Sequence, residues 1–309
     1  MYDILDYGRM VGDERRADAF VAGIRAAVEP GMVVVDIGTG SGLFALIAAQ
    51  CGARRVYAID PDPIVVLAKE LAAENGFADR IEFFRAASRE VTLPERADVI
   101  VADLRGILPL ALDSAGALLD ARERFLKPGG RFVPESDTIF VTVVDSEASY
   151  RRYTEPWSSA PYGLTFAAAR RVGVNFWSRA LATTDNMLTS AVRLAHLEYA
   201  TLASPDLDAT VRLEVLRAGT AHGAMLWFDA RFADGSILSN APDLPPAVYG
   251  RAFFPFEQAV PVDTGDVITL RIRAKLLNIY LWSWETWVER GGKRIASFAQ
   301  STFFAEAVP

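Results

Sequence analysis

A glycine-rich turn with acidic residues close to it is the segment of the sequence best suited to hold a ligand. Residues 36–42 read D-I-G-T-G-S-G, directly after an apolar run and directly before a helical pattern. Glycine lets the backbone turn tightly and come close to a ligand, and the free N–H groups at the start of a helix can donate hydrogen bonds to it. Asp60 ends the next apolar run, where a carboxylate can bind the hydroxyls of a ribose.

The spacing of this turn differs from that of dinucleotide-binding turns. Its glycines, Gly38, Gly40 and Gly42, follow the pattern G-x-G-x-G, whereas dinucleotide-binding turns follow G-x-G-x-x-G. Asp36 stands just before them, at the end of the apolar run. A carboxylate in that place would repel a pyrophosphate and attract an ammonium group. The turn therefore indicates a ligand with an ammonium group rather than a dinucleotide.

Alternating strand and helix patterns place this turn at the edge of a parallel sheet. Short apolar runs typical of buried strands are found at 33–37, 55–59, 81–84, 98–101 and 131–133. Helical patterns lie between them at 43–50, 64–75 and 112–125. This β-α-β-α alternation predicts an α/β fold with a doubly wound parallel sheet.

The sequence changes character after Pro134. β-Branched and aromatic runs, separated by turn signals, are found at 138–144, 211–215, 224–232 and 267–273. They predict a mostly antiparallel β domain, so we expect two domains, at 1–134 and 135–309. The segment from about 150 to 180 is rich in Trp, Tyr, Pro and Arg. It is long and irregular for a plain connector, which favours a role in an interaction.

Composition disfavours several classes of function. The 309 residues carry 32 Lys and Arg against 39 Asp and Glu, a net charge of −7, which disfavours a general binder of nucleic acid or of anionic membranes. One cysteine and two histidines exclude an internal disulfide and leave little for a metal site, so we expect no metal. The first residues lack a signal-peptide layout, and no apolar run approaches about 18 residues. We expect a cytoplasmic protein.

The glycine turn and the acid after the next strand resemble motif I and the acidic loop of class I S-adenosylmethionine methyltransferases. The matching segments are D-I-G-T-G-S-G at 36–42 and A-I-D-P at 58–61. The resemblance implies a Rossmann-like domain, S-adenosyl-L-methionine as cofactor and S-adenosyl-L-homocysteine as product. It also implies that Asp36 and the glycines bind the amino acid part of the cofactor, and that Asp60, followed by Pro61, binds the ribose hydroxyls.

Other segments resemble the protein arginine methyltransferases. M-V-G-D-E-R-R at 10–16 is similar to the M-x-x-D-x-x-R segment that precedes motif I in that family. F-V-P-E at 132–135 resembles the family's crossing into a C-terminal β-barrel, and the segment 150–180 resembles its dimerisation arm. The resemblance implies that Met10 packs near the sulfonium, that Arg16 pairs with the cofactor carboxylate, and that the chain forms a homodimer through the arm.

The loop after the fourth predicted strand departs from this family, which carries two glutamates there. Asp103 stands at the first glutamate position and Leu112 at the second, with Asp113 next to it. Carboxylates are needed because a guanidinium, whose pKa lies above about 12, must be oriented and its charge offset before it reacts. Arg105 stands where a small apolar side chain or methionine is usual. A cation there would repel a guanidinium and could bind a carboxylate or a phosphate.

Two further family positions differ as well. The T-H-W loop of the family corresponds here to Ala247-Val248-Tyr249, and Arg89 replaces the glutamate expected near the adenine amino group. The contact to the base would then rest on the backbone at Ala87 and Ser88.

These departures leave two interpretations open. Asp103 can simply cap the next turn while Arg105 is a surface charge, or the acceptor pocket has been rebuilt. We favour a rebuilt pocket, because several acceptor positions changed together while the cofactor positions are intact.

The sequence therefore predicts a methyltransferase that acts on a small-molecule acceptor through an N or O nucleophile. An amino acid or a natural-product intermediate with an acidic group would fit. Asp103 and Asp113 are the candidate catalytic acids, and Arg105 would bind the acidic group. Tyr7 and Tyr249 are the candidate acceptor contacts. The alternatives are a protein or peptide arginine N-methyltransferase and a non-catalytic cofactor-binding scaffold.

Overall fold

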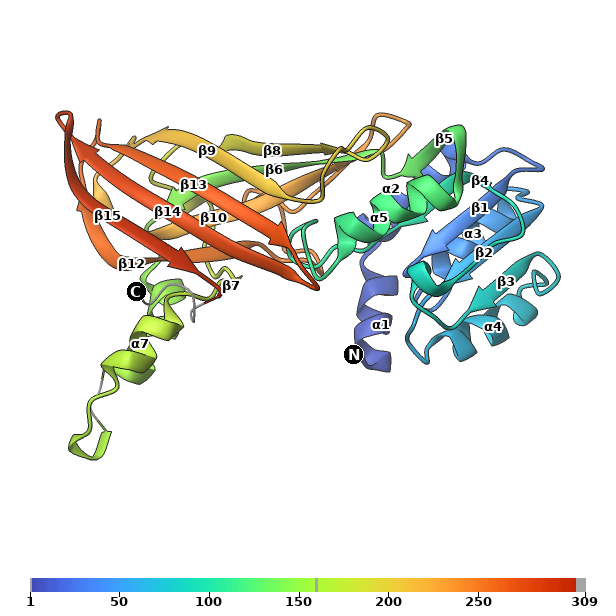
Figure 1. Ribbon diagram of the computed structural model, residues 1–309, viewed down its shortest axis with the longest axis horizontal. Helices are drawn as coiled ribbons and strands as arrows, with labels where there is room; N and C mark the ends of the chain where they lie inside the picture. Colours follow the sequence, from blue (N-terminus) through green and yellow to red (C-terminus); the bar gives the residue numbers. More distant parts are fainter. Residues whose placement is uncertain (1, 159–160, 304–309) are drawn as a thin grey trace.

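The computed structural model describes residues 2–158 and 161–303, in which a parallel sheet is followed by antiparallel sheets (Figure 1). Two helices, α1 (Ile4–Gly12) and α2 (Glu14–Ala27), precede the first strand. Each begins at an aspartate, Asp3 or Asp13, whose side chain accepts hydrogen bonds from N–H groups of the first turn. Such caps satisfy N–H groups that have no partner inside the helix.

The first sheet has five parallel strands in the order β3-β2-β1-β4-β5. These strands are β1 (Val33–Ile37), β2 (Arg55–Ile59), β3 (Ile81–Phe84), β4 (Ala97–Ala102) and β5 (Leu126–Val133). They are connected in part by helices α3 (Leu43–Gln50), α4 (Val65–Glu74) and α5 (Ser114–Arg124). The strand order reverses between β1 and β4, and the crevice at the carboxyl ends of the strands there is where open α/β sheets bind ligands.

The second half of the chain forms two antiparallel sheets that face each other. The first follows the order β7-β12-β10-β6-β8, with β11 paired to β10, and the second the order β15-β14-β13-β9. The strands of the first sheet are β6 (Ser136–Val144), β7 (Ser178–Arg179), β8 (Val192–Glu198), β10 (Gly219–Arg231), β11 (Ile237–Ser239) and β12 (Ala252–Val262). The strands of the second are β9 (Leu207–Glu214), β13 (Val267–Leu276), β14 (Tyr280–Arg290) and β15 (Lys293–Ser301).

Contacts between β8 and β9 and between β12 and β15 bring the edges of these sheets together, which gives a barrel-like shape (Figure 1). Tyr280, Trp282 and Trp284 alternate along β14 and are buried in the core between the sheets. The predicted α/β fold, a Rossmann-like sheet followed by a mostly antiparallel barrel-like domain, is confirmed.

The segment 150–180 projects from the barrel (Figure 1). It contains the end of α6 (Glu147–Thr154), then α7 (Ala167–Gly173) and β7, so it is more helical than its composition suggested. Tyr150 and Tyr153 of α6 are buried against the barrel. Tyr162 is 99% exposed, and Leu164 and Phe176 are exposed as well. The base of the segment is therefore packed, whereas its outer part presents apolar side chains.

Hydrogen bonds and aromatic packing join the two halves of the chain. Arg122 of α5 donates to the carbonyl oxygens of Tyr199 and Leu202 at 3.0 and 2.8 Å. The ring of Phe232, just after β10, packs edge-on against Phe20 of α2 with ring centroids 5.2 Å apart. None of the helices in the described residues is long and apolar enough to cross a membrane.

Candidate active site

The glycine turn between β1 and α3 is closed in by neighbouring side chains. Gly38, Gly40 and Gly42 all have positive φ angles, of 73°, 54° and 86°, which glycine adopts without a steric penalty. A Cβ atom on Gly38 would lie 2.7 Å from Leu104, and one on Gly40 would lie 2.9 Å from the ring of Tyr7. The turn thus needs glycine both for its conformation and for the space around it.

Asp36 is the penultimate residue of β1, just before this turn, and is almost fully buried, with 1% of its surface exposed. Thr39 Oγ1 donates a hydrogen bond of 2.6 Å to its carboxylate. Burial raises the pKa of Asp36 to about 7, and the nearby charge of Asp60 acts in the same direction. A cationic group beside Asp36 would favour its ionised form.

Asp60 follows β2 and lies on the other side of the turn. Its carboxylate accepts the backbone N–H of Gly40 at 2.9 Å and that of Asp62 at 2.8 Å. Burial raises the pKa of Asp60 from its usual value, and the two backbone hydrogen bonds oppose that shift. Tyr7 lies against the same turn, so the structure places it beside the predicted cofactor residues rather than beside Asp103.

A cleft that opens to solvent lies next to this turn at the carboxyl ends of the parallel strands. Its lining residues are mainly apolar or small and come from the ends of four strands and from the start of α5: Ile37, Gly38, Ile59, Pro61, Ala86, Ala87, Ser88, Arg89, Leu104, Asp113 and Ala117. The cleft brings together several of the residues predicted to hold the cofactor.

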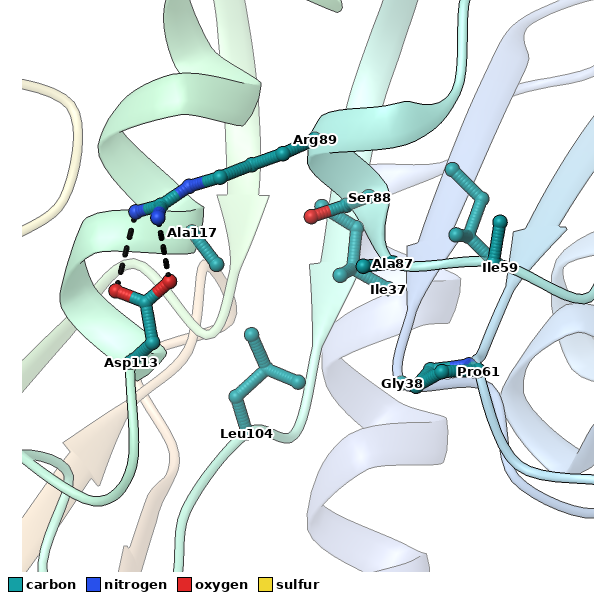
Figure 2. A pocket seen from close by; sticks show the side chains of 11 residues that line it. Ile37, Gly38, Ile59, Pro61, Ala87, Ser88, Arg89, Leu104, Asp113 and Ala117 are labelled. Carbon is teal, nitrogen blue, oxygen red and sulfur yellow. Dashed lines mark hydrogen bonds and ion pairs between the residues drawn. The ribbon is translucent and has the colours of Figure 1, made fainter. Parts of the chain in front are cut away.

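Arg89 and Asp113 form an ion pair at the edge of this cleft. Figure 2 shows them pointing toward each other, with Gly38 and Pro61 across the cleft. Arg89 Nη1 and Nη2 lie 2.8 and 3.0 Å from the carboxylate oxygens of Asp113. Asp113 therefore lines the same cleft as Ala87 and Ser88, which are predicted to contact the cofactor, and the structure does not place it in the cluster around Asp103. Leu112, at the second glutamate position, is 76% exposed.

Asp103, just after β4, lies in a buried cluster of charged groups. Its Oδ2 accepts hydrogen bonds from Arg16 Nε at 2.6 Å and from the Tyr249 hydroxyl at 2.7 Å. Its Oδ1 has only a 3.4 Å contact with Arg105 Nη1. Burial raises the pKa of Asp103, but the charges of Arg16 and Arg105 outweigh it, so the pKa lies below its usual value. Asp103 is therefore an ionised carboxylate whose Oδ1 can accept another N–H.

Arg16 joins this cluster to the N-terminal helices. Its Nη1 donates to the carbonyl oxygen of Met10 at 2.9 Å, and its guanidinium lies over the ring of Phe44, 4.8 Å from the centroid. Asp13 caps α2 through the backbone N–H of Arg16 and also accepts the N–H of Val248 at 2.7 Å. The loop that carries Tyr249 is thus tied to the start of α2.

Arg105 is not positioned as the sequence suggested. Its side chain is only 3% exposed, and its Nε and Nη2 donate to the two carboxylate oxygens of Asp137 in β6 at 3.1 and 2.6 Å. The expectation of a cation free to bind an acidic acceptor is therefore not met, because the fold supplies Arg105 with its own counter-ion.

Asp137 and Tyr199 are members of this cluster that sequence reasoning missed. The Tyr199 hydroxyl donates to the Asp137 carboxylate, and both side chains are buried. One signal was present: Asp137 alternates with Ile139, Val141 and Val143, so it must share their inward face of the strand. An acid on such a face needs a buried partner.

Comparison with known proteins gives matches over most of the chain. The profile of the ribosomal protein L11 methyltransferase family (PrmA) matches residues 19–135, and that of the arginine methyltransferase oligomerization subdomain matches residues 135–279. Probable protein arginine N-methyltransferase 6 of Arabidopsis thaliana is 29% identical over 84% of this chain and 70% of its own length. Protein arginine N-methyltransferase 2 of Homo sapiens is 28% identical over 77% of this chain and 58% of its own length.

Solved structures give the same fold. The Trypanosoma brucei PRMT1 enzyme-prozyme heterotetrameric complex with AdoHcy has a TM-score of 0.86 at 22% identity, over 96% of both chains. Arabidopsis thaliana protein arginine methyltransferase 10 has a TM-score of 0.84 at 20% identity, over 97% of both chains. This chain is a class I S-adenosylmethionine-dependent methyltransferase. Within that class it resembles the protein arginine methyltransferases.

The predicted small-molecule acceptor is wrong. The curated relatives over most of this chain are named as protein arginine N-methyltransferases. The prediction depended on reading Arg105 as a free positive charge in the acceptor pocket. Its pairing with Asp137 removes that reason, because the two charges offset each other inside the protein.

Proposed function

We propose that this chain transfers a methyl group from S-adenosylmethionine to an arginine side chain of a protein or peptide. The observation that carries the proposal is the position of the Asp103 carboxylate after β4, where Arg16 and Tyr249 donate hydrogen bonds to it. A guanidinium acceptor needs such a carboxylate to orient it and to offset its charge. The relatives' names support arginine as the acceptor.

The residues around the cleft fit S-adenosylmethionine. When bound, this cofactor supplies a methyl group on a positively charged sulfur. Arg16 would pair with its carboxylate, and the buried Asp36, whose pKa is raised, would pair with its ammonium group. Asp60 would bind the ribose hydroxyls. The apolar lining beside Ala87 and Ser88 suits a purine ring.

Asp103 would hold the acceptor for an in-line reaction. Its Oδ1 would accept an N–H of the acceptor guanidinium, which fixes the attacking nitrogen in front of the methyl group. The new N–C bond forms as the S–C bond breaks, and the nitrogen then loses one proton to Asp103 or to solvent. Tyr249, which donates to Oδ2, would keep the carboxylate in this orientation.

A methyl-transfer assay with matched peptides tests the proposal. The protein would be incubated with labelled S-adenosylmethionine and a peptide that carries arginine, lysine or citrulline at one position. We expect methylarginine by mass spectrometry and no label on the other two peptides. Failure to methylate arginine in this peptide and in a cell extract, while S-adenosylhomocysteine binds, would refute the assignment.

We also propose that residues 1–134 bind the cofactor, that residues 135–309 form the barrel, and that the chain forms a homodimer through the segment 150–180. Support comes from the match to the oligomerization subdomain and from the exposed Tyr162, Leu164 and Phe176. Apolar side chains exposed on a projecting segment favour an interface. Light scattering should give the mass of a dimer for the full chain and of a monomer after replacement of 156–176 by a Gly-Ser linker.

A further inference from the structure

Asp137 and Tyr199 lie outside the parallel sheet and yet belong to the charged cluster around Asp103. Asp137 is in the first barrel strand, β6, and Tyr199 follows β8. Arg105 connects them to the acceptor side, since it contacts Asp137 with two N–H groups and Asp103 with a third. The carboxylate after β4 is thus linked through one arginine to the barrel.

The position of Arg105 is fixed by its surroundings. Its Nη1 also donates to the carbonyl oxygen of Ala102 at 3.2 Å. Its guanidinium carbon lies 5.9 Å from the ring centroid of Phe20 and 5.8 Å from that of Phe228. A planar guanidinium with a two-point carboxylate partner and aromatic rings beside it has little freedom to turn toward another partner.

The charges in the cluster decide what Asp103 can bind. Arg16 and Arg105 are positive, whereas Asp103 and Asp137 are negative, so the four charges balance. If the cofactor carboxylate pairs with Arg16, as proposed above, and Asp137 pairs with Arg105, the charge of Asp103 is left for the acceptor. In a buried site an unbalanced charge acts strongly on a neighbour because the effective dielectric constant is low.

We propose that Asp137 is a positioning residue for the acceptor: by neutralising Arg105, it leaves the Asp103 carboxylate free to hold a cationic side chain. This inference rests on the proposed arginine methylation. Tyr199 supports it by donating to the Asp137 carboxylate. Without Asp137, the charge of Arg105 would act on the acceptor as well as on Asp103.

An ion pair that only joins the two halves of the chain would behave differently. Its loss would lower the stability of the protein and affect all acceptors alike. If Asp137 offsets the charge of Arg105 near Asp103, loss of the pair should instead change the preference between charged and neutral acceptors. Citrulline is a neutral side chain with nearly the shape of arginine, so peptides that differ only at this residue separate the two cases.

Three variants test the inference. Asp137→Asn keeps the shape but leaves Arg105 unpaired, and Arg105→Met leaves Asp137 unpaired. The double variant R105M/D137N removes both charges, and removal of a complete buried pair is often tolerated far better than removal of one partner. The first variant therefore leaves an extra positive charge near Asp103, the second leaves an extra negative charge, and the double variant leaves neither.

The measurement is the affinity of the protein, loaded with S-adenosylhomocysteine, for the arginine and citrulline peptides. We expect the wild type to prefer the arginine peptide. Asp137→Asn should reduce that preference by about tenfold, a size typical of coupled charged neighbours. In a separate turnover assay with S-adenosylmethionine, it should raise KM for the arginine peptide more than it lowers kcat. Arg105→Met should keep the preference, and the double variant should recover it to within about threefold.

Asp208→Asn serves as the matched control. Asp208 also accepts two hydrogen bonds from one arginine, Arg271, at 2.9 and 2.7 Å, but on the exposed face of the barrel. The control should leave both peptide affinities unchanged. Tyr199→Phe provides a milder change if Asp137→Asn does not fold, and it should reduce the arginine preference in the same direction.

The outcomes separate the inference from the proposed function. Methylation of arginine by the wild type, together with an unchanged arginine preference in Asp137→Asn (or in Tyr199→Phe, should Asp137→Asn not fold), would overturn the role of Asp137 and leave the proposed function standing. A wild type that methylates no arginine would overturn both. Equal losses of affinity for the two peptides would show that the ion pair is only structural.

Discussion

At the scale of single residues, the partners of the buried acids decide their protonation. Asp36 is buried with a hydroxyl and another acid close to it, and its pKa rises to about 7. Asp103 is buried between Arg16 and Arg105, and its pKa falls below the usual value. The acid assigned to the acceptor therefore carries its charge at neutral pH, whereas the acid assigned to the cofactor gains its charge fully when a cation binds.

The raised pKa of Asp36 predicts that cofactor binding depends on pH. Below about pH 7 the ligand-free carboxyl is protonated, and the ammonium group of the ligand favours the ionised form. Binding therefore releases a proton, and affinity for S-adenosylhomocysteine should fall as pH decreases below 7, by at most about tenfold per pH unit for one proton. Calorimetry between pH 5.5 and 8.5 measures this.

The raised pKa of Asp36 also makes the stability of the ligand-free protein depend on pH. The pKa of Asp36 in the folded protein, about 7, exceeds the ordinary aspartate pKa of about 3.9, so the ligand-free protein should lose stability at this site as pH rises from about 4 to 7. The Asp36→Asn variant should bind S-adenosylhomocysteine more weakly than the wild type at pH 8, and its affinity should depend less on pH. The distant Asp79→Asn variant should match the wild type in affinity at each pH. An affinity in the wild type that does not change with pH would contradict this assignment.

Asp103 should matter for turnover and not for cofactor binding. Asp103→Asn keeps the hydrogen-bonding shape but removes the charge, and kcat for an arginine peptide should fall by about 100-fold or more. S-Adenosylhomocysteine should bind at least as well, because Arg16 loses its 2.6 Å partner in the protein. Kinetics of methyl transfer measure the first effect, and calorimetry measures the affinity for S-adenosylhomocysteine. Turnover at the wild-type rate would show that Asp103 has no part in the reaction.

At the scale of elements, the glycine turn depends both on its own sequence and on side chains from distant segments. Its positive φ angles fit the tight turn that the sequence pattern predicts, because glycine adopts such angles without a steric penalty. The side chains that close around it, Leu104 and Tyr7, come from distant segments. Only the structure shows that these glycines also make room for neighbours.

Gly40→Ala and Gly76→Ala separate the need for a positive φ angle from the need for space around the glycine. Both glycines have positive φ, of 54° and 76°, so both alanines should cost about 1–2 kcal/mol of stability. The Cβ at Gly40 would also lie 2.9 Å from the Tyr7 ring, whereas nothing lies within 4 Å at Gly76. We expect only Gly40→Ala to weaken S-adenosylhomocysteine binding, by about tenfold. Equal cofactor affinity in the two variants would contradict a close fit at this turn.

The elements were easier to predict than the acceptor side of the site. The runs 33–37 and 55–59 coincide with β1 and β2, because an apolar run bounded by turns is a local signal. The partner of Arg105 is Asp137, which lies 32 residues away across the junction of the two halves. Such a pairing depends on how the barrel packs on the sheet, so a local reading took Arg105 for a free charge.

At the scale of the whole molecule, aromatic packing connects the barrel to Arg16, one of the residues proposed to hold the cofactor. Phe232 packs edge-on against Phe20, which stacks on Phe44 with centroids 4.4 Å apart. Arg16 lies over Phe44. Close-packed side chains transmit displacements to their neighbours, so a change at Phe232 should reach the guanidinium that is proposed to hold the cofactor carboxylate.

Phe232→Ala tests this connection. Phe232 is fully buried, and its loss should lower the free energy of unfolding by about 3–5 kcal/mol. Phe256→Ala is the matched control, because Phe256 is equally buried but lies in the barrel core. Both variants should lose similar stability in chemical denaturation. Only Phe232→Ala should also weaken S-adenosylhomocysteine binding, by about threefold or more, because α2 loses its support and Arg16 its fixed position. Unchanged affinity in a folded Phe232→Ala variant would mean that the two halves are joined without influencing the cofactor site.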